Sequence, residues 1–188
     1  MVDRAKVIGI DMDDVLTDLL TPWVAELNAL SETKLSAADI SLWEIEQLYP
    51  HISRQDVFDV LNKDSFWASV QPAEMADGFI TALLAHGYDI RIVTSSHYKN
   101  IEAKMSRFFE LFPMLSWKQV VVTSHKQDIK LDILVDDAPH NLIGGDYRKV
   151  LMAKPHNARY DAEANGMYRA RDLMDAFHHI RFGRQNRT

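Results

Sequence analysis

The sequence predicts a doubly wound α/β fold with a mainly parallel sheet and a small helical insert after the first strand. Short, almost continuously apolar runs rich in β-branched residues recur along the chain, and such runs are typical of strands covered on both faces. Helical patterns separate these runs, and strand–helix alternation favours a parallel sheet. A long stretch without a buried strand interrupts the alternation and indicates the insert. The predicted strands are 6–11, 89–94, 119–123, 132–136 and 149–153.

Three helices are expected between and after these strands. Residues 75–86 form a helical pattern that ends at Gly87, because glycine favours the position just after a helix. Residues 101–112 carry apolar side chains at helical spacing and stop before Pro113, which a helix interior does not tolerate. The pattern of 173–180 predicts a further helix near the C-terminus.

The insert is expected to form a helical cap over one edge of the sheet. Residues 19–76 contain helical patterns rich in Trp and Leu, and a connection of this length inside a compact domain is usually functional. We therefore expect residues 1–18 and 77–188 to form the α/β core. Phe66 and Trp67 are adjacent near the end of the insert, and the residues alone favour placing both in its apolar core.

Composition excludes several classes of protein. With 188 residues, 47% of them hydrophobic, the chain can bury the core of one domain plus an insertion. A net charge of −6 argues against a nucleic-acid or anionic-membrane partner, since both attract basic surfaces. There is no cysteine, which excludes disulfides and thiolate chemistry. With neither a signal-peptide pattern nor an apolar stretch that could span a bilayer, we expect a cytoplasmic protein.

Acidic side chains follow the first and fourth predicted strands. Asp11 and Asp13 come after the first strand, and Asp136 and Asp137 end or follow the fourth. In open α/β sheets, ligands bind beyond the carboxyl ends of the strands, so these acids are expected to meet there. Carboxylates that lie so close resist joint ionisation unless a cation compensates them. Mg²⁺ is the expected cation, because it prefers oxygen ligands and substrate phosphates.

Phosphate-binding side chains follow the other two strands. Thr94 and Ser95 end or follow the second strand, and Lys126 follows the third. Hydroxyl and ammonium groups suit a phosphoryl group. Taken singly, each of these residues has a structural explanation as a helix cap or a solvated lysine, and Asp137 also suits a turn. Together they predict a phosphate site around a metal.

The acidic pair after the first strand suggests the chemistry. A carboxylate can attack phosphorus and form an aspartyl-phosphate that water later cleaves. A second carboxylate can protonate the leaving oxygen and then deprotonate the water. Asp11 and Asp13 fit this pair of roles, because side chains two residues apart in an extended segment point the same way.

Four motifs resemble the haloacid dehalogenase superfamily of phosphatases: "DMDDV" at 11–15, "VTS" at 93–95, Lys126, and "DD" at 136–137. Within it the chain is most similar to the 5′(3′)-deoxyribonucleotidases. That resemblance rests on "DMDDVLTD", "SFWASVQPAEMADG", "TSHKQDIKLDILVDDAP" and "PHN" at 155–157. It implies the superfamily's core and cap, a Mg²⁺ cofactor and a small phosphomonoester substrate, most simply a nucleotide.

The resemblance also implies a role for each matched residue. Asp11 would be the nucleophile, and Asp13 the acid/base, with its backbone carbonyl on Mg²⁺. Asp137 would bind the metal, and Asp136 would support it or bind through water. The remaining matches would contact the substrate: Thr94, Ser95 and Lys126 the phosphate, Phe66 and Trp67 the nucleoside. One departure is Asp14, where these nucleotidases usually have Gly, so its carboxylate must turn away from the phosphate.

Other functions remain open at this point. The same chemistry could act on a sugar phosphate or another small phosphomonoester, and the cap would decide. A phospho-acceptor domain similar to response-regulator receivers would use similar groups, but there the acidic pair comes first and the lysine last. A phosphatase-like fold that only binds its ligand is a further alternative.

Overall fold

The computed structural model describes residues 6–183 and contains a six-stranded sheet at its centre. The strand order is β5-β4-β1-β6-β7-β8, and every neighbouring pair is parallel. The predicted α/β fold is therefore confirmed. The strands are β1 (Val7–Ile10), β4 (Asp89–Thr94), β5 (Val120–Val122), β6 (Ile133–Asp136), β7 (Arg148–Met152) and β8 (Met167–Ala170).

All five predicted strands are present, and a sixth was missed. In β8, Met167 and Ala170 are buried while the two residues between them are half-buried. A four-residue edge strand of this kind has no continuous apolar run, which is the signal on which the other predictions rested.

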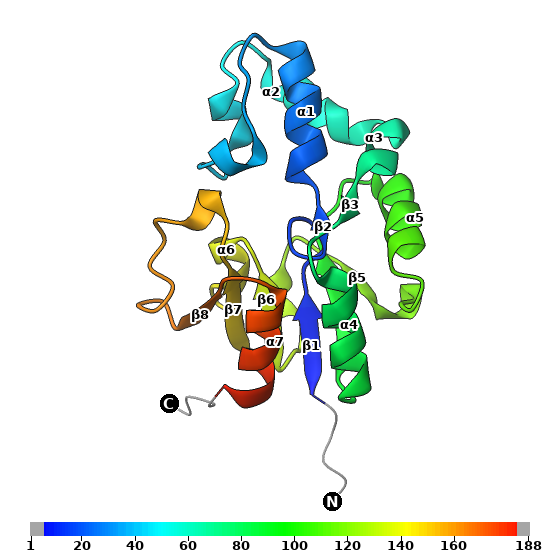
Figure 1. Ribbon diagram of the computed structural model, residues 1–188, viewed down its shortest axis with the longest axis vertical. Coiled ribbons are helices and arrows are strands. Elements are labelled where there is room, and N and C mark those ends of the chain that lie inside the picture. Colours follow the sequence, from blue (N-terminus) through cyan, green and yellow to red (C-terminus); the bar gives the residue numbers. More distant parts are fainter. Residues whose placement is uncertain (1–5, 184–188) are drawn as a thin grey trace, which may run out of the picture.

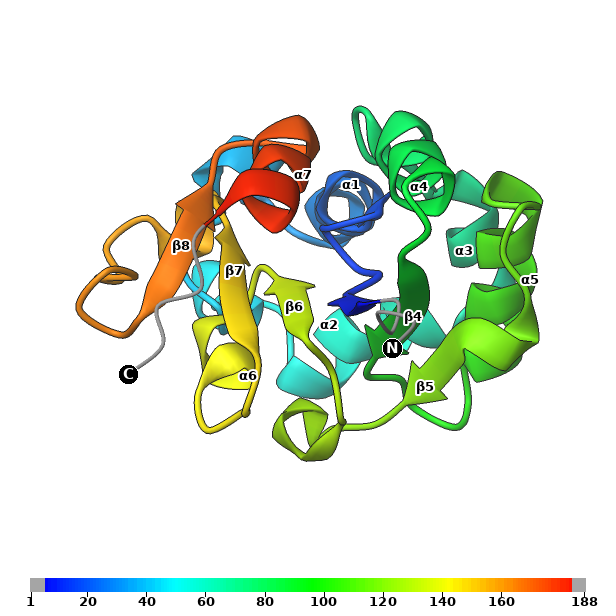
Figure 2. The same cartoon turned by 90° about the horizontal axis from the view of Figure 1, so that it is seen from below.

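Helices cover both faces of the sheet, as Figure 2 shows from below. An apolar cluster on one face joins the strands to α4 (Ala76–Ala85), α5 (Ile101–Leu111) and α7 (Leu173–Phe182). A smaller cluster on the other face includes Leu142 of α6 (Pro139–Leu142). Gly87 follows α4 with φ of 73°, as its predicted place after the helix requires.

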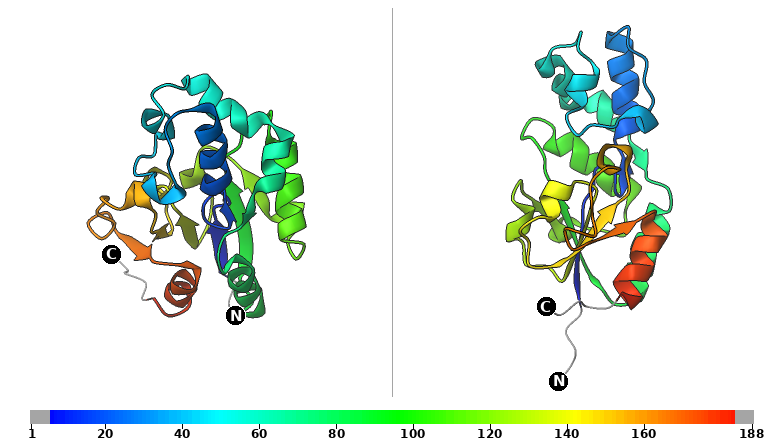
Figure 3. Two further views of the ribbon diagram at one scale, coloured as in Figure 1. Left: turned by 45° about the horizontal axis from the view of Figure 1, so that its top comes forward. Right: turned by 90° about the vertical axis from the view of Figure 1, so that its left-hand side faces the viewer.

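A separate layer of helices stands over the carboxyl ends of the strands (Figures 1 and 3). We call residues 19–70 the cap. Its own apolar core includes Trp23, Leu27, Tyr49 and Phe66. The cap contains α1 (Leu20–Leu30), α2 (Arg54–Asp59), α3 (Asp64–Ser69) and the 3₁₀ turns η1 (Ala37–Asp39), η2 (Ile45–Leu48) and η3 (Val60–Asn62).

Two short strands connect the cap to the sheet. β2 (Thr17–Asp18) and β3 (Gln71–Pro72) pair antiparallel, so the chain enters and leaves the cap through one narrow ribbon. The exact division into a core of residues 1–18 and 77–188 and an insert of 19–76 stays a prediction. Within residues 6–183, none of the helices is long and apolar enough to cross a membrane.

Candidate active site

Asp11 lies immediately beyond β1, at the edge of the sheet that faces the cap. Its backbone N–H donates to the Val135 carbonyl at 2.9 Å, which extends the sheet pairing by one residue. Its side chain is buried, and Oδ1 accepts from the Met12 N–H at 2.8 Å and pairs with Lys126 Nζ at 2.7 Å. Because both donors bind Oδ1, the second oxygen remains available for chemistry.

Lys126 connects the acid that follows β1, Asp11, to the acid that ends β6, Asp136. It begins the 3₁₀ turn η5 (Lys126–Asp128), is only 1% exposed, and lies 2.7 Å from both Asp11 Oδ1 and Asp136 Oδ2. Burial alone would lower the lysine pKa, but the two carboxylates raise it above its usual value. The ammonium is therefore charged and held between two acids that stand 125 residues apart in the sequence.

The Asp136 carboxylate is fully engaged by the protein. Its Oδ1 accepts from the Ala138 N–H at 2.9 Å, and the Asn141 amide donates to both oxygens at 3.1 and 3.2 Å. Together with Lys126, these donors fix the position of Asp136. Sequence reasoning did not identify Asn141, although its place in "DDAPHN" shortly after the acids is a signal that could have drawn attention to it.

Asp137 is held by the "PHN" stretch that carried part of the resemblance. His156 and Asn157 lie in η6 (Pro155–Asn157); His156 Nε2 is 3.2 Å from Asp137 Oδ2, and the Asn157 amide donates to the Asp137 backbone carbonyl at 2.7 Å. Burial opposes protonation of His156, but its contact with Asp137 raises the histidine pKa above the usual value. A loop distant in sequence thus orients this acid.

Asp11, Asp136 and Asp137 each offer one carboxylate oxygen, and these oxygens lie within 4.8 Å of one another. Burial raises the pKa of Asp11 well above its usual value; Lys126 opposes this, and the neighbouring acids reinforce it. Three buried carboxylates against one ammonium leave an excess of negative charge. This donor set fits a hard cation that takes oxygen ligands.

The Asp13 carboxylate turns to a different lysine. Lys104 of α5 is only 2% exposed, and its Nζ lies 2.5 Å from Asp13 Oδ2, 2.9 Å from Thr94 Oγ1 and 2.8 Å from the Ser95 carbonyl. Asp13 Oδ1 is buried and accepts no hydrogen bond from the residues that the structure describes. That unpartnered oxygen is suited to exchange a proton with a ligand.

Lys104 is the functional residue that sequence reasoning missed most clearly. It stands three residues after Ile101 and four before Phe108, on the apolar stripe of the predicted helix. A lysine at such a position must be paired when it is buried, and this was a signal that could have revealed it. Thr94, predicted to bind phosphate, is fully buried and holds this lysine through its hydroxyl.

Ser95 lies at the rim, where its hydroxyl donates to the Thr123 carbonyl at 2.9 Å. It lines two cavities between the core and the cap, of about 750 and 290 Å³. Asp13 also lines both of them, whereas Asp11, Lys126 and Asp137 line the smaller one. Most of the predicted site residues are therefore brought together around a divided cleft, whereas Thr94, Asp136 and Phe66 line neither cavity.

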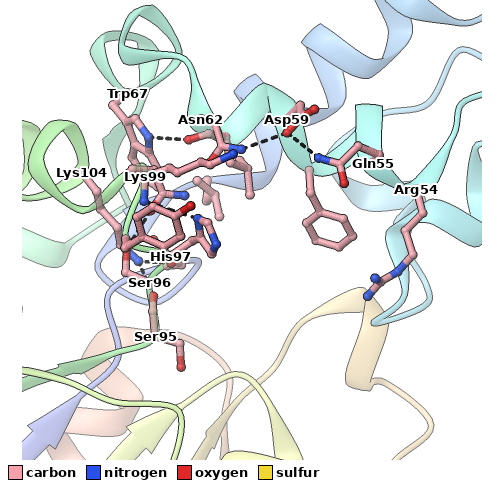
Figure 4. A pocket seen from close by; sticks show the side chains of 16 residues that line it. Arg54, Gln55, Asp59, Asn62, Trp67, Ser95, Ser96, His97, Lys99 and Lys104 are labelled. Atoms are coloured by element: carbon pink, nitrogen blue, oxygen red, sulfur yellow. Dashed lines mark hydrogen bonds and ion pairs between the residues drawn. The ribbon is translucent and has the colours of Figure 1, made fainter.

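Both predicted aromatics belong to the cap core, but Trp67 also lines the larger cavity (Figure 4) whereas Phe66 does not. Trp67 lines the larger cavity, and its indole N–H donates to the Leu61 carbonyl at 2.9 Å. Phe66 is 3% exposed, belongs to the cap core and packs edge-on against Trp67 with ring centroids 5.4 Å apart. Phe66 therefore takes the core position that the residues alone had favoured, and Phe58 and Trp67 are the aromatic rings of the larger cavity's cap wall.

Asp14 adopts the left-handed backbone conformation, with φ of 56°, which glycine adopts more readily than any other residue. Its Oδ1 accepts from the N–H groups of Leu19 and Leu20, at 3.2 and 3.0 Å, where α1 begins. Burial and then Asp137 raise the pKa of Asp14 to about 7, against the hydrogen bond from Leu20. The Asp14 side chain thus links the loop that carries Asp11 and Asp13 to the cap.

The comparisons with known proteins agree with this geometry. A family profile described as "5' nucleotidase, deoxy (Pyrimidine), cytosolic type C protein" matches residues 5–185. The chain belongs to this family. The 5′(3′)-deoxyribonucleotidase of Bacillus subtilis is 35% identical over 156 residues, covering 81% of this chain and 87% of the relative. That of Clostridium acetobutylicum is 34% identical over 172 residues, covering 90% and 91%.

Solved structures agree on the fold of this family. A haloacid dehalogenase-like hydrolase from Streptococcus pneumoniae superposes with a TM-score of 0.62 at 13% identity, covering 94% of this chain and 98% of that one. A hydrolase from Deinococcus radiodurans, solved with bound phosphate and sodium, gives 0.62 at 15% identity and covers 94% of each. The predicted resemblance to the 5′(3′)-deoxyribonucleotidases is confirmed by the family and these relatives, and the predicted haloacid dehalogenase-like fold is confirmed by the solved structures.

Proposed function

We propose that this protein is a Mg²⁺-dependent phosphomonoesterase that hydrolyses (deoxy)nucleoside monophosphates through an aspartyl-phosphate on Asp11. The observation that carries the proposal is the Asp11 carboxylate, bound through Oδ1 by Lys126 and the backbone, with its second oxygen free and Asp13 two residues away. Its membership in a nucleotidase family and the deoxyribonucleotidase names of its relatives support the substrate class.

The first half of the reaction forms the covalent intermediate. Asp11 Oδ2 attacks phosphorus, the bond from phosphorus to the ester oxygen breaks, and Asp13 Oδ1 gives its proton to the leaving oxygen. Lys126 favours the ionised form of Asp11 that this attack needs, because its ammonium opposes the rise in pKa that burial causes. Asp11 and Asp137, with the backbone carbonyl of Asp13, would hold Mg²⁺, whose charge would offset that of the carboxylates and the phosphoryl group.

The second half returns the site to its starting state. Asp13 takes a proton from a water molecule, which attacks phosphorus and releases phosphate from Asp11. Lys104, held by Thr94 and the Ser95 carbonyl, fixes the Asp13 carboxylate and places a positive charge beside the transferring group. Asp136 acts behind the site by positioning Lys126.

Replacing Lys104 with Met is expected to lower kcat at least about 100-fold, because Asp13 loses the partner that fixes its carboxylate. The fold should persist, since Asp13 is partly exposed and water can solvate it in the variant. Steady-state kinetics with a nucleoside monophosphate and a thermal melt measure the two effects. The control is Lys118→Met, at an exposed site outside both cavities. A Lys104→Met variant with near wild-type kcat would remove this residue from the mechanism.

The cavity walls favour a nucleotide over a sugar phosphate. The larger cavity is lined on its apolar side by Leu19, Phe58, Leu61 and Trp67, and aromatic and aliphatic surfaces suit the faces of a base. A phosphate-release screen with Mg²⁺ across deoxynucleotides, ribonucleotides and sugar phosphates tests the proposal. Deoxynucleotides or ribonucleotides should give the highest kcat/KM. A maximum among the sugar phosphates would favour the alternative substrate class.

Mg²⁺ is expected to stabilise the protein more at pH 8 than at pH 5. Burial raises the pKa of Asp11 well above its usual value, and metal binding requires the deprotonated carboxylate. Binding therefore strengthens as the pH rises and the acids lose their protons. At roughly a hundredfold excess over Kd, Mg²⁺ should add about 2–3 kcal/mol of stability at pH 8. Thermal melts with Mg²⁺ or EDTA measure this difference, and an equal shift at both pH values would count against the site.

Two wider assignments belong to the same proposal. We take residues 19–76 as one insert, made of the cap and the segment that returns to the sheet, above a core of residues 1–18 and 77–188. The acidic composition and the family description support a cytoplasmic enzyme that acts on a small molecule.

A further inference from the structure

Arg169 of β8 holds the connection that carries His156 and Asn157. We call residues 153–166, which join β7 to β8 at the edge of the sheet that faces the cap, the β7–β8 loop (Figure 1). The guanidinium donates from Nη1 to Asn157 Oδ1 at 2.7 Å, and from Nη2 to the backbone carbonyls of Asn157 and Tyr160 at 3.0 and 2.7 Å. One planar group therefore fixes the loop at two residues.

The hydrogen bond from Arg169 determines which way the Asn157 side-chain amide points. Asn157 is 2% exposed, and a guanidinium can only donate, so the amide oxygen must face the arginine. The Lys154 N–H donates to the same oxygen at a longer 3.2 Å. The NH₂ group is then directed at the backbone carbonyls of Asp137 and Met152, at 2.7 and 2.8 Å. Arg169 thus favours the orientation in which Asn157 holds the backbone of Asp137.

The same loop also contacts the Asp137 side chain. His156 precedes Asn157, and its Nε2 lies 3.2 Å from Asp137 Oδ2, with the two side chains 5% and 4% exposed. One residue of the loop thus contacts the carboxylate of Asp137 while the next binds its backbone carbonyl. Because Asp137 is one of the three acids whose oxygens lie within 4.8 Å of one another, a shift of the loop would change the spacing of this donor set.

Arg169 lies outside the cleft in which a substrate would bind, since it lines neither of the two cavities between the core and the cap. Among residues 6–183, its guanidinium donates only to Asn157 and Tyr160 and pairs with no carboxylate. Surface charge balance therefore does not account for this arginine. Its donors are spent on the shape of the β7–β8 loop.

We propose that Arg169 is a positioning residue for the metal site, acting through Asn157 and His156 on Asp137. Mg²⁺ demands near-ideal ligand geometry, so its affinity depends on the groups that hold the ligands in place. Without Arg169, the Asn157 amide can turn over and the loop can move, and Asp137 loses its fixed position. This inference rests on the proposed function, in which Asp137 holds Mg²⁺, and adds a residue of the edge strand to that site.

The test measures Mg²⁺ binding to Arg169→Met in the absence of substrate, from the rise in melting temperature across a series of Mg²⁺ concentrations. The Kd for Mg²⁺ is expected to rise about tenfold or more, because loss of a group that orients metal ligands typically costs roughly 10–100-fold in affinity. At saturating Mg²⁺, kcat for a nucleoside monophosphate should fall by less than about threefold, since Arg169 contacts neither the substrate nor Asp11.

A second variant, Arg169→Lys, keeps the charge but loses the fork of donors. The Kd for Mg²⁺ should rise by about threefold or more in this variant as well. It carries the test if Arg169→Met does not fold. An unchanged Kd in every folded Arg169 variant would overturn the inference.

Arg148→Met is the matched control. Arg148 of β7 also donates from both Nη atoms to backbone carbonyls, those of Gly183 and Ile180 at 3.0 and 3.1 Å, but these lie at the end of α7 and not in the β7–β8 loop. Its loss should lower the melting temperature and leave the Kd for Mg²⁺ unchanged. A rise in Kd as large as in the Arg169 variants would mean a general loosening of the fold, which also overturns the inference.

The proposed function and the inference fail in different ways. If the wild type hydrolyses a nucleoside monophosphate and binds Mg²⁺, while the Arg169 variants bind it equally well, only the inference fails. If the melting temperature and the activity of the wild type do not respond to Mg²⁺, the proposed function loses its metal and the inference falls with it.

Discussion

Asp11→Asn is expected to reduce hydrolysis of a nucleoside monophosphate by at least about 10⁴-fold, because an amide cannot replace the attacking carboxylate. The amide still accepts at its oxygen, so the contacts with Met12 and Lys126 can persist. Phosphate release under single-turnover conditions measures the loss. Trapping of a labelled phosphoryl group on the wild type, but not on the variant, would identify the intermediate.

Folding of the Asp11→Asn variant separates lost chemistry from lost structure. Asp11 is one of several buried acids that repel one another, so a neutral side chain at this position should not destabilise the fold. At pH 8 in EDTA, the melting temperature of the variant is therefore expected to equal or exceed that of the wild type. Asp146→Asn, an exposed acid on the loop before β7, serves as the control with full activity. Residual turnover above about 1% in pure Asp11→Asn protein would mean that another residue is the nucleophile.

Lys126→Met should lose both activity and about 3–5 kcal/mol of stability, because Asp11 and Asp136 become buried charges without their partner. For a chain of this length, the melting temperature should fall by about 6–20 °C. Thermal or urea unfolding in EDTA measures the loss, with the exposed Lys118→Met as the control. A variant as stable as the wild type at pH 8 would show that Lys126 does not neutralise the two acids.

The loss in Lys126→Met should depend on pH in a known direction. Burial raises the pKa of both Asp11 and Asp136, so in the variant protonation removes the unpaired charges as the pH falls. Lys126 itself stays charged in the folded and unfolded wild type from pH 5 to pH 8, since its folded pKa lies above the usual lysine value. The destabilisation should therefore be larger at pH 8 than at pH 5.

A double variant separates charge balance from catalysis. Adding Asp136→Asn to Lys126→Met removes one of the two unpaired acids, so part of the lost stability should return. Activity should not return, because Asp11 still lacks its lysine. Recovery of turnover in the double variant would show that Lys126 contributes to folding and not to the reaction.

Much of the core of the site could be predicted, because parallel strands end at a common edge. Asp11, Lys126 and Asp136 each follow or end a strand that has a continuous apolar run, and such runs can be recognised in a sequence. Because these strands lie parallel in one sheet, the three residues end at the same edge, although β4 separates β5 from β1. Topology therefore predicts that Asp11 and Lys126 lie on a common edge, and the turn after β5 brings Lys126 into contact with Asp11.

The other features of the site depend on contacts between distant segments, and no local sequence pattern encodes such contacts. Lys104 reaches Asp13 across 91 residues from the middle of a helix, and its apolar neighbours gave no indication of that partner. Phe66 and Trp67 are adjacent in sequence and both are buried in the cap, but only Trp67 of the two also lines the larger cavity. Which residue of such a pair faces a ligand is decided by packing between segments far apart in the chain.

The bond from Asp14 to the start of α1 has a consequence for how enzymes of this type can diversify. Asp14, the residue that follows the proposed general acid, also holds Leu19 and Leu20, which line the smaller cavity. A cap transplanted onto this loop would therefore have to present two backbone N–H groups to the Asp14 carboxylate. We expect an exchange of caps between such enzymes to give an active protein only when the exchanged segment includes both the loop of residues 11–18 and the cap.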